Sequence, residues 1–316
     1  MTLPLVAVTG ATGFIGRRVV RALVESGCTV RALARRLPAG EQADATDAVS
    51  WVLGSLTDRK TLSALLKDAI AVVHCAGATK AVDREAFLSI NGASTRLLAE
   101  IAAAQSTPPR FVYLSSLAAR EPRLSAYAAS KRAGEQGVRA FQPDLPAIIL
   151  RPPAVYGPGD LETLKIFQMA ARGFVLAPMV DGARASLVHV DDVAAAVMAA
   201  LDLDELPSDP IEFDDGTPGA YSWAEIAAAA GAAVRTNPQL IPVPAPLLYL
   251  AGAAASASAY LTRRPTVMSW GKVPELLHAD WVSAKGYFPG YKPLWNIEKG
   301  FKNAVTWYTS QGLLTS

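Results

Sequence analysis

The stretch VAVTGATGFIGRRVVRALVESG, residues 6–27, joins an apolar run to a segment with helical spacing through three glycines. Gly10, Gly13 and Gly16 follow the spacing GxxGxxG. In such a turn the first glycine bends the chain, the second admits a pyrophosphate, and the third brings the helix close to the sheet. Because the triplet follows a strand and opens a helix, it predicts a dinucleotide-binding turn and not an ordinary glycine-rich loop.

The anion would lie at the start of this helix, where the first N–H groups have no partner within the helix itself. Gly27 is expected to end the helix, because glycine readily adopts the left-handed conformation that follows a last turn. The residues of the turn expected against the cofactor are Gly10, Thr12, Gly13, Phe14, Ile15 and Gly16.

Short apolar runs alternate with helical stretches through the first half of the chain. The runs are LVAVTG (5–10), TVRALA (29–34), SWVLG (50–54), AVVHCAG (71–77), RFVYLSS (110–116) and AIILRPP (147–153). Strand and helix in repeated alternation predict an α/β protein with a doubly wound parallel sheet covered on both faces.

The second half is less regular and predicts a smaller α+β lobe. We expect residues 1–160 to form the dinucleotide-binding domain, and 161–184 with 204–316 to form the substrate-binding lobe. Residues 185–203 are expected to return to the first domain, because ASLVHV (185–190) reads as one more strand of the main sheet. A helix is expected from Ser222.

Composition excludes several classes of protein. Apolar residues make up 51% of the 316 residues, and the net charge is +2, which gives no argument for a nucleic-acid partner. Cys28 and Cys75 lie in apolar contexts, as expected of buried thiols in a reducing compartment, and the three histidines show no metal spacing. We therefore expect a cytoplasmic protein with a small-molecule substrate and no metal.

No signal peptide and no membrane-spanning segment are expected. The stretch PLLYLAGAAASASAYL, residues 246–261, is apolar and is followed by Arg263 and Arg264. It is short and rich in alanine, so a buried or surface-lying helix is expected. A helix lying in a membrane interface is the alternative.

The end of the second strand bears on the choice of cofactor. An acidic residue there accepts a hydrogen bond from a ribose 2′-hydroxyl, whereas arginine pairs with a 2′-phosphate. The sequence VRALARR has Arg35 and Arg36 and no carboxylate before Glu41. Because guanidinium and phosphate pair in a bidentate manner, NADP(H) is favoured and NAD(H) is the alternative.

In SAYAASKRAGE, residues 125–135, Tyr127 precedes Lys131 by four residues, so the two share one face of a helix. Lowering a tyrosine pKa from about 10 to about 7 requires about 4 kcal/mol. One ammonium about 4–5 Å away supplies about 3–4 kcal/mol at an effective dielectric constant of about 20. An oxidised nicotinamide ring adds a second positive charge. The pair therefore predicts proton transfer next to a dinucleotide, provided that the site is buried.

Ser116, at the end of the run RFVYLSS, is the expected third member. The carboxyl end of a parallel strand borders the crevice where ligands of such sheets bind. Its hydroxyl would bond a substrate oxygen, with Ser115 as the competing candidate and a helix cap as the structural alternative.

Together, TGATGFIG, VVHCAG, YLSS, YAASK, LRPPAVYGPGD and LVHVDDVA resemble the extended short-chain dehydrogenase/reductase family, in its epimerase/dehydratase-like branch. The resemblance implies a Rossmann domain with a smaller C-terminal substrate lobe. It assigns catalysis to Ser116, Tyr127 and Lys131, with Lys131 also binding the nicotinamide ribose. Further cofactor-binding positions that it implies are Leu56, Ala76, Gly77, Asn91, Pro152 and Val155.

The arrangement VRALAR looks most like the dihydroflavonol-reductase and hydroxysteroid-dehydrogenase-like members. Two departures from the family pattern matter. Ser55 in GSL replaces the acid expected beside adenine, and Leu117, Ala118 and Ala119 stand where sugar-nucleotide dehydratases carry an acidic pair. A sugar dehydratase is therefore disfavoured.

Three functional hypotheses follow. The leading one is an oxidoreductase that transfers a hydride between nicotinamide C4 and a secondary alcohol or ketone. The second is a sugar-nucleotide epimerase that retains its cofactor, and the third is a non-catalytic nucleotide-binding accessory subunit. The sequence identifies neither the substrate nor the direction of the reaction, and it leaves open whether the chain forms a homodimer.

Overall fold

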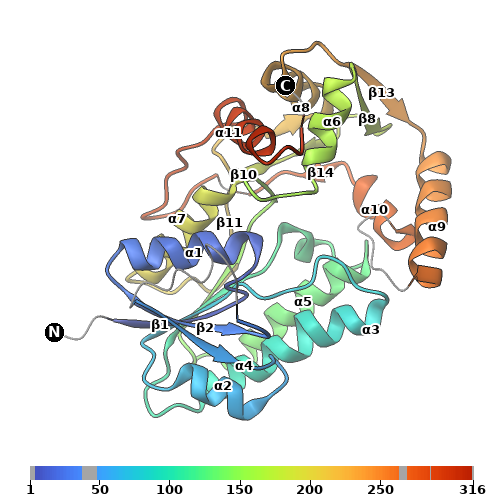
Figure 1. Cartoon of the computed structure of the whole chain (residues 1–316). Helices are drawn as coiled ribbons and strands as arrows, with labels where there is room; N and C mark the ends of the chain where they lie inside the picture. The colour runs from blue at the N-terminus through green and yellow to red at the C-terminus, as the bar shows by residue number, and fades with distance from the viewer. Residues whose placement is uncertain (1–3, 38–47, 263–268, 285, 315–316) are drawn as a thin grey trace. The chain divides into compact units, whose positions relative to one another are not determined.

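The structure, a computed structural model, describes residues 4–37, 48–262, 269–284 and 286–314 (Figure 1). It divides the chain into two compact units. The first contains residues 1–151, 193–211 and 289–291, and the second contains residues 152–192, 212–288 and 292–316. The first segment of the first unit thus ends at Arg151, and a second segment of that unit is residues 193–211. The sequence predicted residues 1–160 and 185–203 for these two segments.

A seven-stranded sheet forms the centre of the first unit, in the order β11-β6-β5-β4-β1-β2-β3 among the described residues. The five pairings that join β6 to β3 through β1 are all parallel. The strands are β1 (Leu5–Thr9), β2 (Thr29–Ala34), β3 (Val49–Leu53), β4 (Ala71–His74), β5 (Arg110–Leu114), β6 (Ala147–Arg151) and β11 (Ile211–Glu212). Every residue of β4 and β6 is buried, as expected of strands covered on both faces.

Helices cover both faces of this sheet. In Figure 1, α1 lies on one side, and α2 and α4 lie on the other. The helices and turns of the unit are α1 (Phe14–Glu25), α2 (Arg59–Leu66), α3 (Arg84–Phe87), α4 (Ser94–Ala103), η3 (Leu117–Arg120), α5 (Ala126–Arg139) and most of α7 (Val190–Leu201). The doubly wound α/β architecture expected from the sequence is therefore confirmed. Gly27 follows α1 with φ +86°, as its expected role at the helix end requires.

The chain around Asn91 departs from regular α-helix. Between α3 and α4 the chain forms a π-helical segment, η2 (Leu88–Ala93). Such segments are rare, and many occur at functional sites because the extra residue changes where side chains point. Here the segment contains Asn91, which is almost completely buried.

One expectation for the main sheet is wrong. The strand expected at 185–190 does not join it: β10 (Leu187–His189) pairs with β7 (Ala154–Tyr156) in a separate two-stranded parallel sheet. Pro152 and Pro153 end β6, since proline donates no ladder hydrogen bond, and the short strand that follows them becomes the partner of β10. The edge beside β6 is instead occupied by β11.

The second unit combines small sheets with helices around an aromatic core. Phe301 of α11 lies edge-on to Tyr156 and to Phe167, with ring centroids 5.0 and 4.9 Å apart. A capping box between Ser222 and Glu225 begins α8, the helix expected from Ser222. The remaining elements are α6 (Leu164–Ala171), β8 (Phe174–Pro178), β9 (Arg184–Ala185), β12 (Tyr221–Ser222), α8 (Trp223–Val234), β13 (Gln239–Val243), α9 (Ala245–Thr262), η4 (Trp270–Lys272), α10 (Val273–Leu276), β14 (Asp280–Trp281) and α11 (Ile297–Ser310).

The stretch 246–261 forms α9, the surface-lying helix expected from the sequence; Arg263 and Arg264 lie outside the described residues. Among the helices that the structure describes, none has both the length and the apolar character needed to cross a bilayer.

Candidate functional site

The glycine turn between β1 and α1 has the geometry that close backbone approach requires. Gly10 has φ +71°, and a Cβ placed there would lie 2.6 Å from the backbone nitrogen of Ala76. A Cβ on Gly16 would lie 2.0 Å from the carbonyl oxygen of Gly10. Glycine is therefore required at both positions by the protein's own backbone.

Gly13 differs from its two neighbours. It precedes α1 with φ −79° and ψ 171°, a conformation open to any residue. A Cβ there would approach only the carbonyl oxygen of Gly10, at 3.1 Å. This one approach is tight, but no further atom beyond the chain neighbours lies within 4 Å of that Cβ position. Gly13 stands at the N-terminus of a helix, where a pyrophosphate is expected to bind. These residues fit a dinucleotide.

The turn after β4 connects the glycine turn to the Tyr–Lys pair. Ala76 contacts Gly10 on one side. On the other, a Cβ on Gly77 would lie 3.2 Å from Asn91 Oδ1 and 3.5 Å from Lys131 Nζ. Gly77 therefore allows the chain to cross close to these two side chains. The structure places Ala76, Gly77, Asn91 and Lys131 next to one another, although they are up to 55 residues apart in sequence.

Asn91 ties the β4 turn to α5. Its Oδ1 accepts a hydrogen bond from the backbone N–H of Ala78 at 2.7 Å, and its Nδ2 donates to the Ala78 carbonyl at 2.9 Å. Nδ2 also donates to Ser130 Oγ at 2.9 Å, and the Ser130 hydroxyl donates to the Tyr127 carbonyl at 2.7 Å. Asn91 thereby fixes the turn of α5 that carries the tyrosine.

Lys131 is buried, with 5% of its surface exposed, and its Nζ donates to the Leu114 carbonyl at the end of β5, at 2.7 Å. Burial lowers the pKa of Lys131 to about 8; the nearby Glu135 carboxylate, a smaller effect, opposes the shift. The ammonium also lies 4.9 Å from the centre of the Tyr113 ring. At neutral pH most of the lysine remains protonated, so a buried positive charge lies one helical turn after Tyr127.

Tyr127 is the second residue of α5 and is half-buried. Its ring lies 6.1 Å from that of Phe87 in an edge-on arrangement. The tyrosine is thus held by packing and is not an exposed side chain on a wet helix face.

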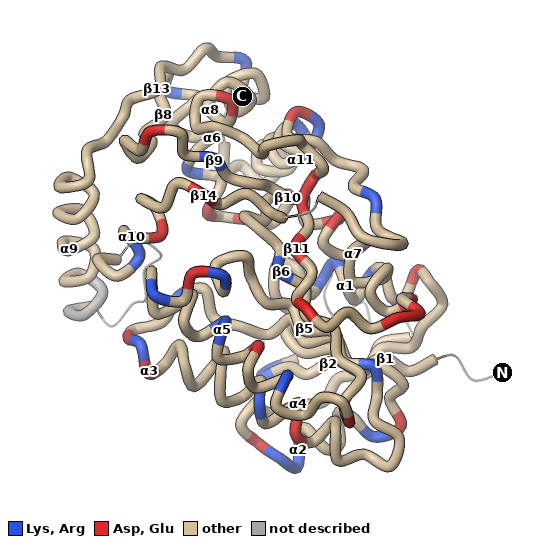
Figure 2. The backbone as a smooth tube through the Cα atoms, turned by 180° about the vertical axis from the view of Figure 1, so that it is seen from behind, with Lys and Arg blue, Asp and Glu red and all other residues tan. Residues whose placement is uncertain are grey.

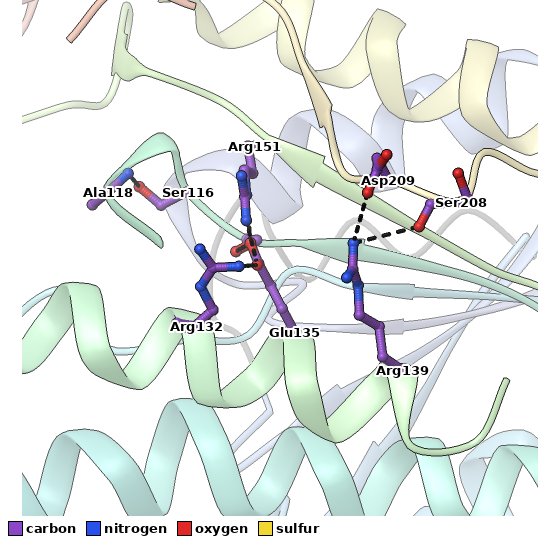
Figure 3. A network of polar contacts seen from close by, with 9 residues as sticks. Ser116, Ala118, Arg132, Glu135, Arg139, Arg151, Ser208 and Asp209 are labelled. Atoms are coloured by element: carbon purple, nitrogen blue, oxygen red, sulfur yellow. Dashed lines mark hydrogen bonds and ion pairs between the residues drawn. The ribbon is translucent and has the colours of Figure 1, made fainter. Parts of the chain in front are cut away.

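The two serines after β5 have different partners. Ser115 is buried and donates its hydroxyl to Glu135 Oε1 at 2.6 Å. Ser116 caps the η3 turn by accepting from the backbone N–H of Ala118 at 3.2 Å (Figure 3). Because a capping serine acts as acceptor, its own hydroxyl hydrogen is not used in that bond. The cap and a role in substrate binding are therefore compatible at Ser116, while Ser115 is part of a buried network.

Sequence reasoning missed the residues that hold this network. Glu135 forms a two-pronged ion pair with Arg151, with both N···O distances 2.7 Å, and a longer one with Arg132 (Figure 3). Glu135 follows Lys131 by four residues, so the helical spacing that selected Tyr127 and Lys131 could also have found it. The pair joins α5 to β6.

Arg35 and Arg36 are exposed and directly follow β2, whose neighbour β1 leads into the glycine turn. Leu56 is half-buried against the core, as expected of a residue that could face adenine. Ser55 is exposed, and its hydroxyl lies 2.9 Å from Thr57 Oγ1. Pro152 and Val155 belong to the second unit, and their assignment to the cofactor stays a prediction.

His74 and the two cysteines have structural surroundings. His74 bonds Thr9 and Thr95 through its two ring nitrogens, and burial lowers its pKa to about 3, so it is neutral at physiological pH. Burial raises the pKa of Cys75 to about 12. Among the described residues, no cluster of His, Cys, Asp or Glu could hold a metal ion.

Comparison with known proteins agrees with this geometry. Residues 6–211 match the model of the NAD dependent epimerase/dehydratase family. The chain belongs to this family. The resemblance to the extended short-chain dehydrogenases/reductases is confirmed, and the chain is an NAD(P)-dependent enzyme of the reductase or epimerase type.

The proteins similar to this chain include reductases. The chain is 42% identical to the ceramide reductase of Caulobacter vibrioides over 98% of its own length and 96% of the relative's. It is 31% identical to a putative dihydroflavonol 4-reductase of Synechocystis sp., over 61% of this chain and 62% of that protein. The solved structure of MoeE5 in complex with UDP-glucuronic acid and NAD has the same fold, with a TM-score of 0.69 and 22% identity over 98% of this chain and 99% of that one.

The glycine turn gives a prediction that separates folding from ligand binding. We expect Gly16→Ala to lower the free energy of unfolding by about 3 kcal/mol or more, because its methyl group meets the Gly10 carbonyl. Gly13→Ala should lose much less stability than Gly16→Ala, because its close contact with the Gly10 carbonyl, at 3.1 Å, is relieved by a small shift. It should still bind the dinucleotide at least about tenfold more weakly, because the methyl group takes up the space expected for the pyrophosphate. Thermal unfolding and cofactor titration measure the two effects. Equal cofactor affinity in Gly13→Ala and wild type would contradict this assignment.

Proposed function

We propose that this enzyme is an NADP(H)-preferring reductase that converts a ketone to a secondary alcohol on a ceramide-class lipid, in the cytoplasm. The observation that carries the proposal is the buried, charged Lys131 one turn after Tyr127 and hydrogen-bonded at the end of the strand that leads to Ser116. The near full-length similarity to a ceramide reductase supports the substrate class.

NADP(H), when bound, supplies the hydride. The chain's own residues then act on the substrate oxygen. Ser116 donates its hydroxyl hydrogen to that oxygen and orients it. The Tyr127 hydroxyl donates the proton that completes the alcohol, and the Lys131 ammonium stabilises the phenolate that remains. Asn91 positions Tyr127 by holding the first turn of α5 through its hydrogen bond to Ser130.

Ceramide carries a secondary hydroxyl on its long-chain base, and its keto form is the corresponding substrate for reduction. We therefore expect the purified chain to oxidise NADPH when a keto-ceramide is added in detergent, with formation of ceramide measured by mass spectrometry. Absence of the reaction with this substrate, while short-chain ketones are reduced, would reject the lipid assignment and keep the reductase chemistry. Activity on a nucleotide sugar without added cofactor would instead identify an epimerase.

The preference for NADP(H) depends on Arg35, with Arg36 in support, because both follow β2 and the sequence has no acidic residue between the end of β2 and Glu41. We expect Arg35→Gln to raise the KM for NADPH about tenfold or more, since a charge-assisted bidentate pair with the 2′-phosphate is lost. The KM for NADH should change little in the same variant, because NADH has no 2′-phosphate. The NADH measurement is therefore the control for the NADPH measurement. A similar change for both cofactors would mean that Arg35 does not contact the 2′-phosphate.

A further inference from the structure

Helix α9 (Ala245–Thr262) is unusual in the second unit because it is apolar and yet mostly exposed or half-buried. It has no charged residue and no polar stripe, and Figure 2 shows its described part without a blue or red segment. Among residues 245–258, the part of α9 whose side chains the structure describes without a break, Gly252 is the single buried one. A helix that is apolar all round is normally covered by protein or by lipid.

Gly252 shows how α9 is fixed to the unit. A Cβ there would lie 3.0 Å from Val273 Cγ2 and 3.1 Å from the Trp270 Cα, so the helix packs closely on η4 and α10 at this residue. The Trp270 backbone N–H also donates to Ser256 Oγ at 3.0 Å. The helix is therefore held in a defined place while its larger side chains face outward.

These outward side chains are large and apolar. Leu247, Leu250 and Trp270 are 55%, 67% and 54% exposed, and we call them the α9 surface. Leu247 and Leu250 are three residues apart and share one side of the helix. The Tyr249 and Trp270 rings lie 4.7 Å apart, on the side of α9 where Gly252 and Ser256 meet η4. Leu240 and Ile241 of β13, the strand before α9, are exposed as well.

The sequence around α9 carries an excess of positive charge. Between Glu225 and Glu275 the sequence contains no aspartate or glutamate, but it contains Arg235, Arg263, Arg264 and Lys272. Lys272 forms an ion pair with Glu275, so the uncompensated charge of this stretch comes from the three arginines. Two of them directly follow α9 in the sequence and lie outside the described residues.

We propose that the α9 surface docks this enzyme onto an anionic lipid bilayer. An uncharged helix with exposed leucines, together with a tryptophan–tyrosine pair, fits the level between headgroups and acyl chains. Basic residues with no acid among them fit anionic headgroups, each contributing to the attraction. A protein partner would be expected to meet a polar rim around the apolar centre, which the sequence of α9 does not provide. The inference stands on this surface and not on the proposed substrate.

Sedimentation with substrate-free vesicles tests the docking without any turnover. We expect the full chain to bind vesicles of phosphatidylcholine with phosphatidylglycerol and to bind pure phosphatidylcholine vesicles less. Leu250→Ser should weaken binding about tenfold, and Leu247→Ser with Leu250→Ser about a hundredfold, because each leucine loses its transfer into lipid. Leu294→Ser is the matched control, because Leu294 is 76% exposed and lies outside the α9 surface. Its binding should equal that of the wild type.

Two further measurements complete the test. Changing Arg263 and Arg264 to glutamine should weaken binding to the anionic vesicles about fivefold for each arginine. The blue shift of tryptophan fluorescence on vesicle binding should be largely lost in Trp270→Phe. Failure to sediment with anionic vesicles overturns the proposal, and so does equal binding by the double leucine variant. A dimer that dissociates when the leucines are changed, without vesicle binding, would show that a second copy covers the surface instead.

Discussion

The Tyr127→Phe variant is expected to reduce its substrate at least about a thousandfold more slowly than the wild type, because the general acid is removed and a positioned proton donor contributes about 10²–10⁴-fold. Cofactor binding should persist, since the phenyl ring can keep its edge-on contact with Phe87. The measurements are steady-state turnover and titration with NADPH. The thermal unfolding temperature should stay close to that of the wild type.

Tyr287→Phe is the matched control for this variant. Tyr287 belongs to the second unit and is 70% exposed, so loss of its hydroxyl should leave turnover unchanged. Normal turnover in Tyr127→Phe would reject the proposed mechanism, whatever the substrate. Loss of both turnover and NADPH binding would instead mean that the hydroxyl contributes mainly to the cofactor site.

Lys131→Met is expected to lower turnover about a hundredfold or more, because the positive charge that stabilises the tyrosine anion is lost. The effect should depend on pH in the wild type. Since burial lowers the pKa of Lys131 to about 8, the ammonium is lost above that pH in the free enzyme. The value of kcat/KM, which reports the free enzyme, should therefore fall in the wild type as pH rises through about 8.

The same lysine should make the free energy of unfolding rise with pH, over the range in which kcat/KM falls. Below about pH 8 both the folded and the unfolded chain carry the proton, and the full cost of the buried charge is present. Between about 8 and 10.5 the unfolded chain binds more protons than the folded one, so the free energy of unfolding rises with pH. We expect the wild type to gain about 3 kcal/mol relative to Lys131→Met over this range. Chemical denaturation at several pH values measures the gain, and an unchanged difference would mean that the lysine is not buried.

Whether a feature could be predicted from the sequence depends on how far apart along the chain the residues that form it lie. The glycine turn, the end of α1 at Gly27, the start of α8 at Ser222 and the helical spacing of Tyr127 and Lys131 were all predicted, because each is set by neighbouring residues. The doubly wound fold was predicted as well, since repeated strand and helix periods leave few other arrangements. Family membership followed from the same motifs.

Tertiary structure decided what depends on partners far along the chain. Ser115 and Ser116 are neighbours in sequence, and only the hydrogen bond from Ser115 to Glu135, twenty residues away, distinguishes them. The pairing of β10 with β7 could not be read from apolar runs, because such runs do not specify a partner strand. The crossing of Gly77 over Asn91 and Lys131 likewise appears only when β4, η2 and α5 pack together. Local chemistry selected the reacting residues, whereas long-range packing buried the lysine and gave it a lowered pKa.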